Sequence, residues 1–207
     1  MPAGRTALMV LALSALVVVC FLQFSRVHVA PLLAGRGPIA SASAAVGITS
    51  ENIASADEMQ ELAARRLLIP VEGIDRAKLR DNFEEGRGGR RHDALDIMAA
   101  RGTPVRAVDS GRVAKLFDSK AGGLTVYQFD REEKYAYYYA HLDRYAEGLK
   151  QGALLNRGDL VGYVGTTGNA PASAPHLHFA IFRLGVERKW WKGTAVNPYP
   201  FLVEASR

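Results

Sequence analysis

The sequence predicts a mainly β domain built on an antiparallel sheet or sandwich, preceded by an apolar N-terminal segment and a tether with one short helix. Runs rich in Val, Ile, Tyr and Phe are broken by Gly, Asp and Asn, as in hairpin-linked strands. These runs have no long helices between them, so parallel crossovers are excluded. The 48% hydrophobic content of the 207 residues suits one globular domain, and the single cysteine excludes an internal disulfide.

An uncharged apolar run spans residues 7–22 and is followed by Arg26. At about 1.5 Å per residue it falls slightly short of a roughly 30 Å hydrocarbon core, a gap that the snorkelling arginine can close. A membrane anchor over 1–28 and a cleaved export signal both stay open. The small residues at 40–42 lie farther past the run than cleavage usually falls, which favours the anchor. Lipid attachment at Cys20 is disfavoured because a β-branched residue precedes it.

Residues 29–68 are predicted to form a linker. Its first part, 30–48, is rich in Ala, Gly, Ser and Pro and lacks helical periodicity. Ser55-Ala-Asp-Glu58 resembles a capping box and predicts a helix over 56–67, with Pro70 ending the pattern. We interpret this helix as a spacer that packs on the edge of the following domain.

The predicted β domain covers residues 69–204. Its strands are expected at 105–108, 111–117, 124–129, 135–142, 160–164 and 176–183. Strands at this spacing pair through hairpins, so the sheet is expected to be antiparallel and to curl or pack on itself.

The net charge of +5 and the pI near 9.4 permit an anionic partner, such as nucleic acid, acidic lipid or a cell-wall polymer. Nucleic acid is disfavoured because the arginines at 87–91 form a local cluster beside candidate ligands. A lipoyl or biotinyl carrier is also disfavoured, since no lysine lies between Gln151 and Arg188 to carry the group.

Four of the five histidines lie in the β-rich region; the fifth, His28, flanks the apolar run. On a strand, His176 and His178 share one face while the residues after them, 177 and 179, point to the other. Such a pair can share one metal ion, but it is also common as an exposed or hydrogen-bonded pair.

His92 and Asp96 lie four residues apart, or roughly 13 Å on a straight strand. The chain must therefore bend between them if both hold one ion, and the glycines at 86–89 supply flexible backbone nearby. The alternative is an exposed loop in which Asp96 pairs with Arg90 or Arg91.

A tyrosine-rich strand leads to His141. Alternation places Tyr135, Tyr137, Tyr139 and His141 on one face, opposite Ala136, Tyr138, Ala140 and Leu142. The tyrosines are expected to form a polar aromatic wall. The alternative for Tyr135 and Tyr137 is an amphipathic strand whose hydroxyls reach solvent.

Together, these motifs resemble the lysostaphin-type zinc metallopeptidases of family M23, also called LytM domains. The resemblance rests on His92-x-x-x-Asp96, Tyr139-Ala-His141-Leu and His176-Leu-His178-Phe, in that order. It extends over about residues 69–202 and includes the connecting pieces 102–108, 158–168 and Val196-Asn-Pro198.

The resemblance implies a LytM-type peptidase fold and one Zn²⁺ per chain, held by His92, Asp96 and His178. It also implies that His141 and His176 stand at the open side of the metal as acid and base. Two imidazoles and a carboxylate leave room for a zinc-bound water that attacks an amide carbonyl. The implied reaction is hydrolysis of peptide crosslinks or bridges in bacterial peptidoglycan.

The expected partners are peptidoglycan stem peptides, the membrane through the anchor, and an envelope protein that regulates the domain. The expected location is the inner membrane with the domain facing the periplasm; secretion after signal cleavage is the alternative. A crosslink of a Gram-negative-type envelope is favoured over an oligoglycine bridge.

The competing function is a non-catalytic LytM-type module that activates a cell-wall amidase or scaffolds an envelope complex. Such modules typically lack metal ligands, whereas all five motif residues are present here.

The chain departs from the family pattern at two positions. Ala94 stands where glycine is usual, and Ala180 stands where glutamate often follows the His-Leu-His-Phe run. These changes bear on substrate preference more than on activity. Trp190 and Trp191 are also unusual, and for them we expect a loop in which one tryptophan packs into the core. Stacking on sugar rings or on a membrane interface is the alternative.

Overall fold

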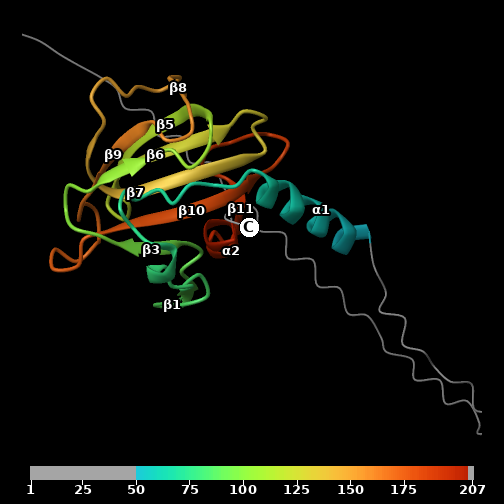
Figure 1. Cartoon of the computed structure of the whole chain (residues 1–207), viewed down its shortest axis with the longest axis horizontal. Helices are drawn as coiled ribbons and strands as arrows, with labels where there is room; N and C mark the ends of the chain where they lie inside the picture. Colours follow the sequence, from blue (N-terminus) through green and yellow to red (C-terminus); the bar gives the residue numbers. More distant parts are fainter. Residues whose placement is uncertain (1–49, 205–207) are drawn as a thin grey trace, which may run out of the picture. The chain divides into compact units, whose positions relative to one another are not determined.

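A computed structural model describes residues 50–204 of the chain (Figure 1). The helices are α1 (Ser50–Ala64), the 3-10 helix η1 (Arg76–Lys78) and α2 (Tyr199–Val203). The strands are β1 (Gly86–Arg87), β2 (Arg90–Arg91), β3 (Leu95–Met98), β4 (Pro104–Arg106), β5 (Gly111–Ser119), β6 (Gly123–Asp130), β7 (Tyr135–Tyr145), β8 (Leu154–Leu155), β9 (Leu160–Val164), β10 (His176–Leu184) and β11 (Gly193–Val196).

Nine of these strands form one antiparallel sheet, as the sequence predicts. Its main order is β11-β10-β7-β6-β5-β8, while β3 pairs with β10, and β9 pairs with both β7 and β4. The long strands β5, β6, β7 and β10 lie side by side in Figure 1. All six predicted strands exist, and the strands without a prediction are only two to four residues long.

The main core lies on one face of this sheet. Side chains from β7, β9 and β10 are fully buried there, among them Leu142, Val161, Leu177, Phe179 and Ile181. The burial of Leu177 and Phe179 confirms the predicted alternation of β10, so His176 and His178 lie on the opposite face.

The predicted tyrosine wall is wrong, because Tyr135, Tyr137 and Tyr139 are buried in the main core. The Tyr137 hydroxyl donates to Asp109 (3.1 Å). The Tyr139 hydroxyl donates to Gln128 Oε1 (2.8 Å) and accepts from a backbone N–H (3.0 Å). Buried tyrosines need such partners, and these come from segments that strand alternation does not reveal.

Both predicted ends of the linker helix are also wrong. Helix α1 runs from Ser50 to Ala64, so the expected capping box falls inside it. Arg66 adopts a left-handed backbone with φ of 49°, which ends the helix before Pro70. Leu62 is nevertheless buried in the main core, so the helix does pack on the domain.

Within residues 50–204, no helix is both long and apolar enough to cross a membrane. The predicted anchor at 7–22 and the predicted tether at 30–48 lie outside the described residues and stay predictions.

Candidate metal centre and active site

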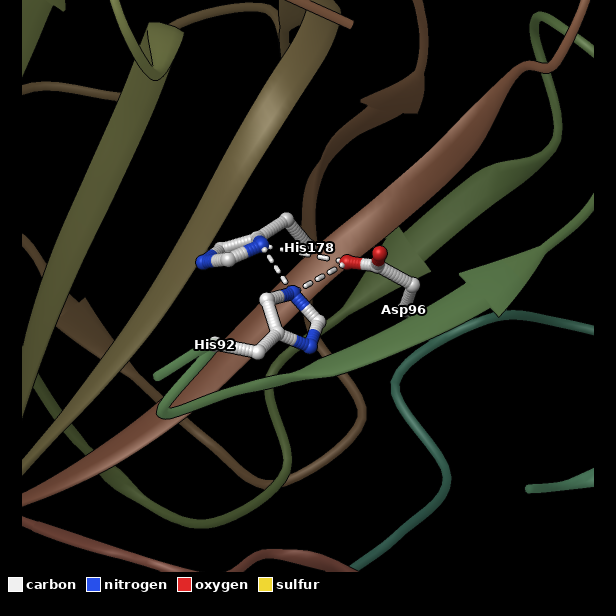
Figure 2. A group of neighbouring side chains, drawn as sticks. All are labelled: His92, Asp96 and His178. Atoms are coloured by element: carbon white, nitrogen blue, oxygen red, sulfur yellow. Dashed lines mark hydrogen bonds and ion pairs between the residues drawn. The ribbon is translucent and has the colours of Figure 1, made fainter. Parts of the chain in front are cut away.

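Three predicted ligands converge on the face of the sheet opposite the main core (Figure 2). Asp96 in β3 lies directly opposite His178 in β10, and His92 approaches from the segment before β3. Asp96 Oδ1 is 3.0 Å from His92 Nε2 and 3.1 Å from His178 Nδ1, and the two nitrogens are 3.1 Å apart. The three donor atoms therefore form a nearly equilateral triangle.

This triangle fits a zinc ion. Zinc takes nitrogen and oxygen ligands at roughly 2.0–2.2 Å in a tetrahedron, where neighbouring donor atoms are about 3.3–3.5 Å apart. The observed separations of 3.0–3.1 Å are close to that spacing. Three protein ligands also leave the fourth position for water or substrate, as in catalytic zinc sites.

The expected bend between His92 and Asp96 is present, but its cause differs from the one predicted. Asp93 has a left-handed φ of 57° and turns the chain between the two ligands. Gly88 and Gly89 also have positive φ, but they form the turn of the β1–β2 hairpin. A non-glycine residue in this conformation costs about 1–3 kcal/mol, and such strain often accompanies functional sites.

The alternative salt bridges from Asp96 to Arg90 or Arg91 do not form. Arg87 instead donates to Asp96 Oδ2 at 2.8 Å. This leaves Oδ1, the oxygen nearest both histidines, for a metal ion. Arg87 therefore orients the carboxylate.

Asn82 supports two of the three candidate ligands, and no motif or spacing in the sequence pointed to it. His92 Nδ1 donates to the Asn82 backbone carbonyl at 3.0 Å, which leaves Nε2, the nitrogen that faces the cluster, as the atom that would bind a metal ion. The Asn82 side-chain oxygen accepts from the Asp96 N–H at 3.2 Å. This residue thus fixes the ring of one ligand and the backbone of another.

The charges at the site favour an ionised Asp96. Burial would raise the pKa of Asp96, but hydrogen bonds from His178, His92 and Arg87 hold it well below its usual range. Burial would lower the pKa of His92, but the hydrogen bond and the charge of Asp96 raise it. Burial lowers the pKa of His178. The cluster thus offers one carboxylate and two imidazoles to a cation.

His141 joins this site through a break in the strand pattern. The β6–β7 register shifts between Leu124 and Val126, where β7 contains one extra residue, and His141 has a φ of 59°. The prediction that His141 shares the face of Tyr135, Tyr137 and Tyr139 is therefore wrong. At this bulge β7 changes partner from β10 to β9, and His141 turns toward the metal-ligand cluster.

The imidazole rings of His141 and His176 are oriented by the same kind of hydrogen bond. Their Nδ1 atoms donate to backbone carbonyls, those of Thr167 and Ala174, at 2.8 Å each. This assignment leaves a lone pair on each Nε2. The two rings are 5.0 Å apart by centroid, and His176 Nε2 is 3.7 Å from Asp96 Oδ1. Burial lowers the pKa of His141 to about 4, so it is neutral at pH 7.

A groove of about 530 Å³ opens over these histidines. It is lined by the β1–β2 hairpin, by Tyr138 and Phe182 on the sheet, and by residues 169–171. Both alanines that depart from the family pattern are buried, and Ala180 pairs with Tyr138 across β7 and β10. Their methyl side chains can neither bind a metal ion nor form a hydrogen bond with its ligands.

Residues 90–198, which contain all five predicted site residues, match the model of peptidase family M23. Over 123 residues the chain is 33% identical to the L-Ala--D-Glu endopeptidase of Bacillus subtilis, covering 56% of this chain and 36% of that protein. Over 135 residues it is 29% identical to lysostaphin of Staphylococcus simulans, covering 60% and 26%. The chain thus spans about a quarter to a third of these relatives.

Solved structures agree with this similarity. Lysostaphin from Staphylococcus simulans superposes with a TM-score of 0.52 at 28% identity, covering 62% of this chain and 50% of that one. Csd3 from Helicobacter pylori superposes with a TM-score of 0.51 at 26% identity, covering 66% and 33%. The aligned part of the chain therefore has the fold of these proteins.

Proposed function

The chain belongs to peptidase family M23, and on this premise we propose that it is a zinc-dependent endopeptidase acting on peptide crosslinks of bacterial peptidoglycan. The observation that carries the proposal is the triangle of His92, Asp96 and His178 beside two further histidines with Nε2 lone pairs. A relative from Vibrio cholerae that is named as a peptidoglycan DD-endopeptidase, 31% identical over 97 residues, supports the substrate class.

In this proposal His92, Asp96 and His178 would hold a zinc ion, which would supply a water of lowered pKa and Lewis-acid polarisation of the scissile carbonyl. The substrate carbonyl would lie in the groove over the histidines. One neutral imidazole of the pair His141 and His176 accepts the proton of the attacking water at Nε2. The imidazolium formed by this transfer would donate a hydrogen bond to the developing oxyanion and then pass its proton to the leaving amine.

The backbone carbonyls of Thr167 and Ala174 make this proton transfer efficient. They hold both rings in one tautomer and orientation, so that no reorganisation precedes the reaction. Burial lowers the pKa of His141, so that ring is unprotonated at neutral pH and its Nε2 lone pair is free. A module that only activates an amidase has no use for this arrangement, which favours the catalytic function.

We further propose that residues 7–22 anchor the chain in the inner membrane and that residues 69–204 face the periplasm. The uncharged run and its flanking arginines, Arg5 and Arg26, support the anchor, and the periplasmic side follows from the peptidoglycan substrate proposed above.

The full-length protein in mild detergent is expected to release soluble fragments from purified peptidoglycan sacculi. We expect a chelator to abolish release and about one equivalent of Zn²⁺ per chain to restore it, because the ligand triangle holds one ion. Mass spectrometry of the fragments identifies the bond that is cut. Zinc binding without release under any condition would instead support the amidase-activating module.

Arg90 bears on the choice between a crosslink and an oligoglycine bridge. Of the three arginines that line the groove, Arg87 pairs with Asp96 and Arg91 pairs with Glu84. Arg90 is exposed and has no carboxylate partner among residues 50–204. An unpaired cation at the groove attracts a stem peptide, because such a peptide carries acidic residues. It does not strengthen the binding of an uncharged glycine bridge.

We therefore expect Arg90→Ala to raise the KM for an acidic crosslinked stem peptide about three- to fivefold, since exposed ion pairs contribute up to about 1 kcal/mol. The kcat should change little, because Arg90 does not contact the histidines. Steady-state kinetics at two salt concentrations measure both. The control is Arg131→Ala, which removes an equal charge at the far end of β7. Equal effects of the two variants, or a preference for pentaglycine, would contradict this substrate choice.

A further inference from the structure

A row of aromatic rings runs from the metal site across the same face of the sheet. The Tyr138 ring is 6.0 Å from that of His178, and Tyr127 on the neighbouring strand is 4.5 Å from Tyr138. Trp190 follows at 4.8 Å from Tyr127, and Trp191 at 5.3 Å from Trp190. Phe117 completes the row, 5.4 Å from Trp190. We call these five residues, Tyr138, Tyr127, Trp190, Trp191 and Phe117, the aromatic row.

The outer part of the row is open to solvent. Trp190 is partly buried, since it covers a small apolar cluster formed by Ala114, Phe129 and Ala136, which agrees with the expected packing of one tryptophan. Trp191, however, is 62% exposed and Phe117 is 42% exposed. Packing in the domain does not account for these two rings, and exposed apolar patches often mark binding sites.

The row is continuous with the groove over the histidines. Tyr138 and Phe182 line that groove, and Phe182 packs on the same small cluster as Trp190. A molecule whose peptide lies at the metal site can therefore extend along the row. A membrane or a second copy seated on the row would cover the face through which the cell-wall peptide must enter.

Cations flank the exposed rings. Lys115 Nζ is 5.9 Å from the Trp190 ring centroid, and Lys189 Nζ is 5.9 Å from that of Trp191. Lys189 also pairs with Glu187 at 2.9 Å. These groups offer hydrogen-bond donors and acceptors at the edges of flat apolar rings.

We propose, on the basis of the function proposed above, that the aromatic row binds sugar rings of the glycan strand to which the crosslink peptide is attached. The apolar C–H faces of pyranose rings stack on aromatic rings, while lysines and carboxylates at the edge meet their hydroxyl and acetamido groups. A four-residue extended peptide spans at most about 14 Å. This is shorter than the ring-to-ring path from His178 to Trp191 but long enough to bring an attached sugar close to Trp190. The row thus binds the sugar end of a substrate whose peptide end is cut.

The test uses the two tryptophans themselves. The chain has two tryptophans, and both belong to the row, so intrinsic tryptophan fluorescence of the full-length protein reports on it alone. We expect the soluble tetramer of N-acetylglucosamine to change this emission saturably. Trp191→Ala should weaken the affinity about fivefold or more, because one exposed stacking ring is lost. The control is Val186→Ala, since Val186 is 99% exposed between β10 and β11 and joins no ring contact.

Three outcomes would overturn the proposal: no emission change with the tetramer, equal affinity in wild type and Trp191→Ala, or a Trp191-dependent change with anionic phosphatidylglycerol vesicles but none with sugar. The last would make the row a lipid surface. Binding is measured without hydrolysis, so failure of the proposed activity leaves this test intact. As a second readout, Trp191→Ala should lower the ratio of kcat/KM for sacculi to that for glycan-free crosslinked peptides.

Discussion

Replacing His178 with alanine is expected to remove bound zinc and with it the hydrolytic activity. His178 Nδ1 is one corner of the donor triangle, 3.1 Å from both other donor atoms. Two ligands, His92 and Asp96, then remain, and two protein ligands hold zinc far more weakly than three. We expect zinc to fall from about one per chain to less than about a tenth after gel filtration, and affinity to fall at least about 100-fold.

Metal analysis of the purified variant and competition with a chromophoric chelator measure these changes. His176→Ala is the matched control, since His176 lies on the same strand and face, two residues away. Circular dichroism and thermal melting check that the sheet is intact. Full zinc retention in His178→Ala would show that His92, Asp96 and His178 do not form the metal site.

The candidate ligand set was predicted through the resemblance to family M23, and it agrees with local geometry because two of its members lie in regular strands. The His-x-His pair needs only the alternation of a strand, and the buried Leu177 and Phe179 agree with it. Spacing also required a bend between His92 and Asp96, and the chain does bend there. Local rules therefore made one shared site possible, and the choice of His92, Asp96 and His178 as its candidate ligands came from the resemblance to family M23. The chain turns at Asp93 rather than at a glycine.

The face of the sheet on which His141 lies could not be predicted in this way. Alternation placed it beside Tyr139, but one extra residue in β7 turns it to the opposite face. The bulge lies where β7 exchanges β10 for β9, and this exchange depends on strands more than 15 residues away in sequence. A single inserted residue reverses every facing assignment after it, so a local pattern cannot reveal it.

The residues that support the site were missed for a related reason. Asn82 and Thr167 act through their backbone carbonyls, which accept hydrogen bonds from His92 and His141. Arg87 acts through an exposed guanidinium, which donates to Asp96. Backbone carbonyls leave no signature in residue type. Arg87 belongs to an arginine cluster that resembles an ordinary solvated surface, so only the folded structure distinguishes it from Arg90 and Arg91.

His176→Ala is expected to keep zinc and to lose hydrolysis. His176 Nε2 is 3.7 Å from Asp96 Oδ1, farther than the ligand donors are from one another, and its ring instead faces that of His141. Its removal leaves the donor triangle complete but deprives the reaction of one of two imidazoles. Positioned acid–base groups contribute about 10²- to 10⁴-fold, so we expect kcat to fall by that factor, with little change in KM.

Zinc content and steady-state kinetics on one preparation separate the two roles. The matched control is Met98→Ala: Met98 lies directly opposite His176 on β3, is 56% exposed and carries no titratable group. It should keep both zinc and activity. A zinc loss in His176→Ala equal to that in His178→Ala would make His176 a ligand. Undiminished kcat would instead assign the proton transfer to His141 alone, whose neutral ring and fixed Nδ1–H already suit a base. The two alanine variants of β10 thus test the ligand and proton-transfer roles from neighbouring positions on one strand face.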